Sequence, residues 1–101
     1  MWAGNWASGN ITVPNLSQYG MFMFVSSSFP ITLLGFALWS NDIQAYAIDL
    51  NATYGQRTFS MLCNRSGDTL SNLKTSVVIN NYSGNNGEKG TFPITHIYGI
   101  I

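Results

Sequence analysis

The side chains of this chain that could carry acid, base or nucleophilic chemistry are few, and their contexts favour structural roles. The carboxyl, thiol and imidazole side chains belong to Asp42, Asp49, Asp68, Glu88, Cys63 and His96. Cleavage of a glycosidic bond needs two carboxyl groups held across that bond. Asp42 follows Ser-Asn and Asp68 follows Ser-Gly, at turn sequences where such side chains cap the backbone. No G-x-S-x-G segment accompanies the histidine. We therefore expect no enzymatic activity.

Metal and cofactor chemistry also lack support. One histidine and one cysteine cannot supply the usual ligand set of a zinc site. The segment GNNGEKGT, residues 84–91, resembles a phosphate-binding loop, but Lys89 precedes Gly90 instead of following the second glycine of that motif. We expect no cofactor, no metal, and a hairpin loop at 84–91. We expect Cys63 to be a buried small hydrophobic residue and His96 to lie on a strand face.

The charge balance excludes one class of partner. Charged residues make up 8% of the chain, where a soluble domain carries about 25%. Four acidic residues balance four basic ones, which lie far apart at Arg57, Arg65, Lys74 and Lys89. Because nucleic-acid binding takes most of its affinity from phosphate neutralisation by clustered cations, we expect no nucleic-acid partner.

The same composition predicts self-association. A surface of neutral Asn, Ser, Thr and Gly repels its own copies weakly. In the segment MFMFV, Met21 and Met23 occupy one face of an expected strand, and Phe22 and Phe24 occupy the other. A single domain covers one of these faces, and a neighbour could cover the second. We expect a homo-oligomer, and specifically a trimer.

Length and hydropathy indicate one domain without a membrane segment. The chain has 101 residues, near the commonest domain size, and no linker divides it, so we expect one domain over residues 1–101. The run MFMFV is far shorter than the ~20 apolar residues of a membrane-spanning helix. No basic stretch precedes an apolar segment near Met1, so we expect neither membrane insertion nor a signal peptide.

Alternating apolar residues between turn sequences predict an all-β domain. β-branched, aromatic and turn-forming residues dominate, and glutamate occurs once. About eight short strands at a spacing of roughly ten residues are typical of an antiparallel β-sandwich, here expected to be jelly-roll-like, with the first and last strands in the sheets. The expected strands lie within residues 9–15, 18–28, 31–39, 43–50, 56–63, 73–80 and 91–101.

Two of these segments have unusual patterns. ITLLGFALW, residues 31–39, is apolar on both faces; a short helix would fit its apolarity, but the β-branched start and the central Gly35 favour a strand. Strands that are apolar on both faces should be covered on both sides. GTFPITHIYGII, residues 90–101, is apolar and strand-prone to its last residue, so we expect this end of the chain to be held in the sheet.

Aromatic residues within polar segments suggest carbohydrate as a ligand, because a sugar offers an apolar face to an aromatic ring and hydroxyl edges to amides and charged groups. The expected stacking residues are Trp39, Tyr54 and Tyr82. The expected hydrogen-bonding residues are Asn41, Asp42, Arg57, Asn85 and Asn86. The alternative is that each aromatic only plugs an end of the sandwich, and this alternative is favoured for Trp2 and Trp6.

The two ends of the chain together resemble a known family. WAGNWASGNITVPNLSQYGMFMF, residues 2–24, and NYSGNNGEKGTFPITHIYGII, residues 81–101, resemble the C-terminal module of tail and fibre proteins of tailed phages and prophages. That pattern opens on W-x-G-x-W/L-x-S-G-x-I-T-V-P and closes on a Gly-rich polar loop before I-x-x-I-Y-G. The matching positions are Trp2, Gly4, Trp6, Ser8, Gly9, Ile11, Thr12, Val13, Pro14, Ile94, Ile97, Tyr98 and Gly99.

The resemblance covers about the first quarter and the last fifth of the chain. It implies a β-sandwich at the tip of a virion tail, made in the host cytoplasm, that attaches without catalysis to host cell-surface carbohydrate. An alternative is a structural module that trimerises or caps a tail fibre and binds no ligand of its own. A glycan-cleaving tailspike fragment is a more distant alternative. The matching residues are structural in type, so the resemblance names no ligand contact.

Overall fold

The computed structural model describes residues 1–28, 30–38, 41–51, 55–80 and 86–101. Within these ranges the regular structure is β-strand with one short 3-10 helix, and there is no α-helix. The elements are β1 (Trp2–Trp6), β2 (Ile11–Thr12), η1 (Leu16–Gln18), β3 (Met21–Ser26), β4 (Ile31–Leu38), β5 (Asp42–Asn51), β6 (Gly55–Ser66), β7 (Thr69–Asn80), β8 (Asn86–Gly90) and β9 (Ile94–Gly99). The all-β class expected from the sequence is confirmed, and β4 is a strand as Gly35 indicated.

The strands form one antiparallel sheet in the order β1-β9-β3-β4-β5-β6-β7-β2, with β8 also paired to β7. Successive hairpins join β3 to β7, whereas a jelly roll alternates its strands between two sheets. β9 lies between β1 and β3, so the last strand is internal to the sheet. β2 and β8 pair with opposite ends of β7.

The sheet nearly closes on itself through the segment that enters β9. The Thr75 hydroxyl, in the middle of β7, donates a hydrogen bond to the Phe92 carbonyl oxygen (3.0 Å) and accepts one from the Phe92 amide (3.1 Å). The buried Phe92 ring meets Phe59 of β6 edge to face, with centroids 5.8 Å apart. These contacts bring the β7 side and the β9 side of the sheet together around one core.

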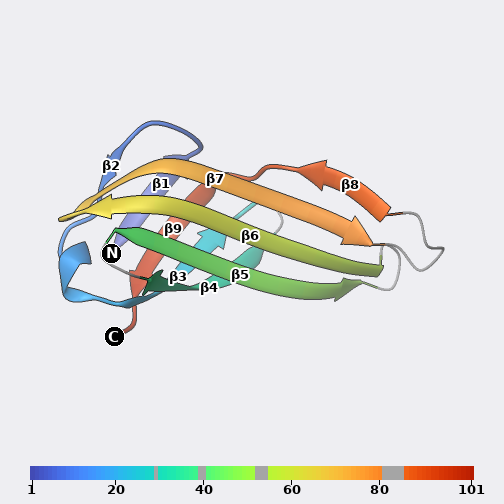
Figure 1. Cartoon of the computed structure of the whole chain (residues 1–101), viewed down its shortest axis with the longest axis horizontal. Helices are drawn as coiled ribbons and strands as arrows, with labels where there is room; N and C mark the ends of the chain where they lie inside the picture. Colours follow the sequence, from blue (N-terminus) through green and yellow to red (C-terminus); the bar gives the residue numbers. More distant parts are fainter. Residues whose placement is uncertain (29, 39–40, 52–54, 81–85) are drawn as a thin grey trace.

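Three long strands give the molecule its shape. Figure 1 shows β5, β6 and β7 side by side, with β3, β4 and β9 behind them. The three strands continue past the rest of the sheet and make the molecule elongated, 45 × 23 × 19 Å. We call this extension the arm; it comprises residues 47–51, 55–58, 78–80 and 86–90. Both chain termini lie at the opposite end (Figure 1).

The core is formed by the inner faces of the strands together with Leu16 of η1. Alternation places one apolar set of each strand inside, as the two-residue period of a strand requires. In β3, for example, Phe22 and Phe24 are fully buried while Met21 and Met23 face outward. The large, fully buried side chains are Trp6, Phe22, Phe24, Phe59, Leu16, Leu33, Ile43, Leu70, Ile94, Ile97, Val13 and Cys63.

The end of the chain is held in the sheet, as expected. The Ile101 carbonyl oxygen accepts hydrogen bonds from the amides of Gly20 (2.6 Å) and Met21 (3.0 Å). Gly99 packs under the Tyr19 ring, where a Cβ would lie only 2.6 Å from a ring carbon. The Ile101 side chain itself is exposed, so backbone hydrogen bonds and β9 pairing fix this end, rather than burial of its last side chain.

The opening segment forms a strand, Trp2–Trp6, although the expected strands began only at residue 9. β1 pairs with β9, and Trp6 is buried with its indole N–H bonded to the Gly9 carbonyl oxygen at 3.1 Å. The Trp2 ring covers Gly4, where a Cβ would lie 2.8 Å from it. The interpretation of Trp6 as a structural plug is therefore confirmed.

The outer faces of β3 and β4 depart from the expectation that both sides of an apolar strand are covered. Leu34 and Phe36 are 42% and 41% exposed, and Met23 is 36% exposed. No described segment of the chain forms a second layer over these side chains. The reason is the near-closure of the sheet, which uses all the strands to surround one interior.

A corner in the sheet lies between β3, β4 and β5. A Cβ on Gly35 would be 2.7 Å from Cε2 of Phe24 and 3.0 Å from the Ala45 Cβ. Glycine within a strand often marks such a bend or close approach. β4 pairs with β5 only as far as the Leu34–Tyr46 pair, although it continues to pair with β3 beyond this point. The missing side chain of Gly35 thus lets the Phe24 ring fill the corner.

We expect Gly35→Ala to destabilise the fold by about 1–3 kcal/mol, because the added methyl group overpacks the contact with Phe24 and Ala45. Urea denaturation followed by tryptophan fluorescence would measure the change. Gly20→Ala is the matched control, since the nearest atom to its new Cβ, the Ile101 carbonyl oxygen, lies 3.9 Å away. Equal stability of the two variants would show that the corner does not depend on glycine.

Candidate ligand-binding surface

Most of the ligand contacts expected from the sequence cannot be placed. Trp39, Tyr54, Tyr82 and Asn85 lie outside the described residues. Asn86 is the first residue of β8, and its side chain is outside the described part of the structure. The proposal of stacking aromatics at these positions therefore stays a prediction.

The remaining expected residues do not come together. Asn41 is exposed at the turn before β5, and Asp42 begins that strand, where its carboxylate accepts a hydrogen bond from the Asn64 amide at 2.7 Å. Arg57 lies opposite Asp49 in the β5–β6 ladder. Seven residues of extended strand separate Asp42 from Asp49, which is roughly 23 Å. One small ligand cannot contact both groups.

Arg57 also has local partners. Its guanidinium forms an ion pair with Asp49 on the inner face of the arm, and its Cζ lies 5.4 Å from the Phe59 ring centroid. Both ionic side chains are largely buried, at 17% and 28% exposed. The buried Nε atom of Arg57 has no hydrogen-bond partner among the described residues. This arrangement assigns Arg57 to the structure of the arm.

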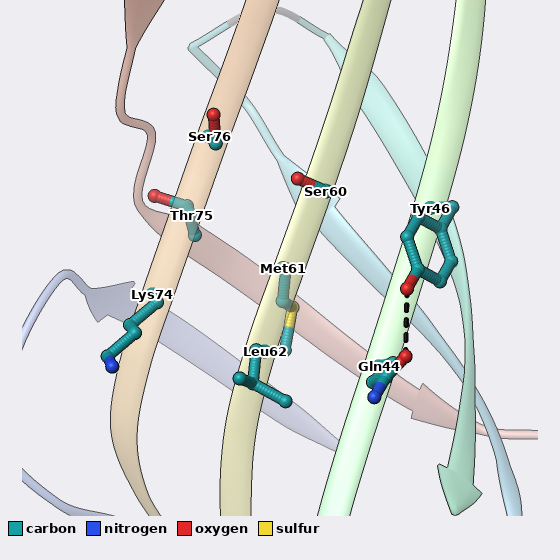
Figure 2. Close-up of a pocket in the computed structure, with 8 residues that line it drawn as sticks. All are labelled: Gln44, Tyr46, Ser60, Met61, Leu62, Lys74, Thr75 and Ser76. Atoms are coloured by element: carbon teal, nitrogen blue, oxygen red, sulfur yellow. Dashed lines mark hydrogen bonds between the residues drawn. The ribbon is translucent and has the colours of Figure 1, made fainter.

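A different group of side chains surrounds a shallow hollow of about 300 Å³ on the outer face of the sheet (Figure 2). The hollow lies over three adjacent strands, β5, β6 and β7. Its lining residues are Gln44, Tyr46, Ser60, Met61, Leu62, Lys74, Thr75 and Ser76.

The strand register explains the shape of this hollow. Tyr46, Ser60 and Ser76 are directly paired across the three strands and form one row of outward side chains. Gln44, Leu62 and Lys74 form the neighbouring row. Paired strands lie about 4.8 Å apart and alternate side chains about 7 Å apart along a strand. The two short serine side chains thus leave a depression between larger neighbours.

Tyr46 is the largest side chain at the hollow. It is 54% exposed, and its hydroxyl donates a hydrogen bond to Oε1 of Gln44 at 2.8 Å. Figure 2 shows this bond, with the Tyr46 ring extending along β5 toward Gln44. The bond restricts the ring before any ligand arrives, which lowers the entropy cost of stacking on it.

Lys74 supplies the charge of the site. In the described residues the one ion pair is Asp49–Arg57, so the Lys74 ammonium has no carboxylate partner there. A second hollow, of about 390 Å³, shares Leu62 and Lys74 with the first and continues to Asn64 and Asn72. The Asn72 side-chain amide donates to Oδ1 of Asn64 at 2.8 Å. The surface therefore offers amides, hydroxyls and one cation beside a single aromatic ring.

Among the described residues, Asp68, His96 and Cys63 do not line this hollow. The Asp68 carboxylate accepts a hydrogen bond from the Ser17 amide at 2.9 Å, and this bond lowers the pKa of Asp68. His96 stacks on Tyr98, and its Nδ1 lies 3.1 Å from the Thr95 hydroxyl. Cys63 is buried, as expected, and its desolvation raises the thiol pKa to about 12. No three of the described His, Cys, Asp and Glu residues are placed to hold a metal ion.

Sequence reasoning missed Tyr46 because both faces of its strand are apolar. The alternating sets in β5 are Ile43, Ala45 and Ala47 on one face and Gln44, Tyr46 and Ile48 on the other. Gln44 could have identified the outward face of this strand, because a polar residue usually faces solvent, and Tyr46 lies on the same face as Gln44. The serines opposite Tyr46 lie 14 and 30 positions further along the chain, and only the register brings them together.

Comparison with known proteins adds no relative. No family model matches the chain, and no curated protein or solved structure shows significant similarity to it. Among the described residues, no helix has the length and apolarity needed to cross a membrane.

We expect Arg57→Ala to lower the free energy of unfolding by about 1–2 kcal/mol, because it leaves the partly buried Asp49 carboxylate without its cation. Lys74→Ala is the matched control, an exposed cation outside any described ion pair, and should change stability by a few tenths of a kcal/mol at most. Urea denaturation of both variants measures the difference. An Arg57→Ala variant as stable as the wild type would contradict the role of Arg57 in stabilising the arm.

We also expect Cys63 to resist thiol reagents in the folded protein. Burial disfavours the thiolate, so the pKa of about 12 keeps Cys63 protonated at neutral and mildly alkaline pH. Labelling by an aromatic disulfide reagent at pH 8 should be slow in buffer and fast in concentrated urea. Rapid labelling in buffer, at the rate of a free thiol, would contradict the burial of this residue.

Proposed function

We propose that this chain is a non-catalytic binding module of a phage tail that attaches to carbohydrate on the host cell surface. The observation that carries the proposal is the exposed Tyr46 ring, held by Gln44 at the edge of a hollow floored by Ser60 and Ser76. An aromatic ring beside amide and hydroxyl groups matches the apolar face and polar edges of a sugar.

The chemistry of the hollow favours a sugar over other small ligands. An apolar ligand would need an enclosed pocket lined by hydrophobic side chains, whereas this surface is open, and most of its outward side chains are polar: Gln44, Ser60, Lys74 and Ser76. Lys74 lies in the second row, where its ammonium could pair with a carboxylate or phosphate substituent. We therefore expect acidic bacterial polysaccharides to bind more tightly than neutral ones.

The non-catalytic part of the proposal is supported by the partners of the described carboxylates. Asp42 is bonded to Asn64, Asp49 to Arg57, and Asp68 to Ser17. Each carboxylate thus has a structural role, and none of the three lines the Tyr46 hollow. Hydrolysis of a glycoside needs two carboxyl groups across one bond.

The phage-tail part of the proposal rests on the resemblance of the two end segments. The positions that carry the resemblance include several with clear packing roles, such as Trp6, Val13 and Ile97 in the core. The structural alternative, a module that joins fibre subunits without a ligand, is favoured by the exposed apolar residues of β3 and β4. The two functions are compatible, because they use different parts of the outer face.

Replacement of Tyr46 tests the binding function. We expect Tyr46→Ala to weaken binding to isolated bacterial surface polysaccharide at least tenfold, about 1.4 kcal/mol, through loss of the stacking platform. Tyr46→Phe keeps the ring and should retain most of the affinity. Biolayer interferometry against immobilised polysaccharides, preceded by a glycan-array screen, provides the measurement, and melting temperatures confirm folding.

Tyr98→Ala is the matched control. Tyr98 is another exposed tyrosine of the outer face, 42% exposed on β9, but it does not line the hollow. Its replacement should leave polysaccharide binding unchanged. Equal binding by wild type and Tyr46→Ala, or failure of the wild type to bind any polysaccharide of the screen, would overturn the proposal and favour the purely structural alternative.

A further inference from the structure

β5 has a free edge along half of its length. Its pairing with β4 ends at the Leu34–Tyr46 pair, while its pairing with β6 continues to the end of the strand. Within the described part of the chain, residues 47–51 therefore have a strand partner on one side only. Figure 1 shows this stretch of β5 as a border of the arm. Backbone N–H and C=O groups along such a border can pair with a further strand.

The side chains along this edge do not protect it. Native proteins usually guard an open edge with a charged side chain, a proline or a covering loop. Ile48 and Leu50 point to the outer face and are 66% and 73% exposed. Asp49 is the one charged residue of the stretch, and the ion pair with Arg57 neutralises it on the inner face. The edge therefore has apolar outward side chains, no proline, and no charge that lacks a partner.

The partner that fits is an extended strand with apolar side chains at alternate positions and no unpaired charge. β5 itself meets this description, and a second copy brings no net charge to oppose the contact, since the chain has four acidic and four basic residues. We propose that two copies of this chain pair edge to edge, in antiparallel orientation, through residues 47–51 of β5.

The geometry of this pairing is self-complementary. Two identical edges in antiparallel orientation are related by a two-fold axis perpendicular to the sheet, so one continuous sheet forms and the outer faces of both copies look to the same side. Ile48 and Leu50 of each copy then lie beside the same residues of the other. Two exposed apolar side chains per copy become one cluster of four.

The apolar surface continues from this edge across the outer face of the sheet. The exposed apolar side chains on this part of the outer face are Met23, Leu34, Phe36, Tyr46, Ile48, Leu50 and Tyr98. Four of them form a continuous cross-strand row over β9, β3, β4 and β5. Because the two sheets lie side by side in this pairing, these outer faces stay exposed, and the contact consists of backbone hydrogen bonds and the cluster formed by Ile48 and Leu50 of both copies.

This pairing would place the two Tyr46 hollows on one side of the dimer. A polysaccharide, or a surface covered with it, could then meet both hollows at once, and two linked contacts bind more tightly than either alone. The pairing itself needs no ligand, so it can be tested apart from the binding function.

Light scattering coupled to gel filtration tests the proposal. We expect the wild type to pass from one chain, 11.1 kDa, to twice that mass as its concentration rises into the high micromolar range. Ile48→Lys puts a cation on the edge of each copy, where the two charges repel, and should weaken the dimer at least tenfold. Amide hydrogen exchange at residues 47–50 should slow with concentration in the wild type but not in Ile48→Lys.

Thr58→Lys is the matched control, because Thr58 lies directly opposite Ile48 on β6, on the same face but one strand away from the edge. This variant should dimerise like the wild type, and melting temperatures of both variants should match it. A wild type that stays monomeric, forms a trimer, or pairs equally well with Ile48→Lys would overturn the proposal. Binding of an unrelated extended peptide by a strictly monomeric wild type would overturn the choice of a second copy.

Discussion

The close approach of the Phe24 ring and of Ala45 to Gly35 lies where the paths of β4 and β5 diverge. It lets the sheet turn between β3, β4 and β5, so β4 follows β3 while β5 continues straight with β6 and β7. Because the sheet turns there, one set of strands surrounds the core and the other extends as the arm. The open edge of β5, and with it the exposed Ile48 and Leu50, follows from this divergence.

The sequence predicts the fold class because the two-residue period is strong and helix-favouring residues are scarce. Gly35 and the β-branched start of residues 31–39 also identify a strand that apolarity alone leaves ambiguous. The strand order is beyond sequence reasoning here. Closure depends on a hydroxyl of Thr75 meeting the backbone of Phe92, and nothing in either local sequence indicates that contact.

The sequence named the types of side chain that a carbohydrate site would need, but it did not place them in the fold. Aromatic rings beside amides and hydroxyls suggested a sugar as ligand. The structure has such a group at Tyr46, in the middle of a strand, whereas the expected aromatic residues lie in polar segments between strands. The difference is physical, because a half-exposed sheet face assembles its side chains across strands through register. Arg57 shows the converse. The sequence suggested that its guanidinium is available to a ligand, but in the structure this group pairs with Asp49 and lies over the Phe59 ring.

Amide NMR spectra of the isotope-labelled wild type, titrated with fragments of bacterial surface polysaccharide, test the binding function most directly. We expect the largest shift changes at Gln44, Tyr46, Ser60 and Ser76, with Lys74 joining them for acidic fragments, and small changes at β1 and β9. Changes confined to other surfaces, or none with any fragment at millimolar concentration, would contradict the assignment of the outer face of β5, β6 and β7 as the carbohydrate site.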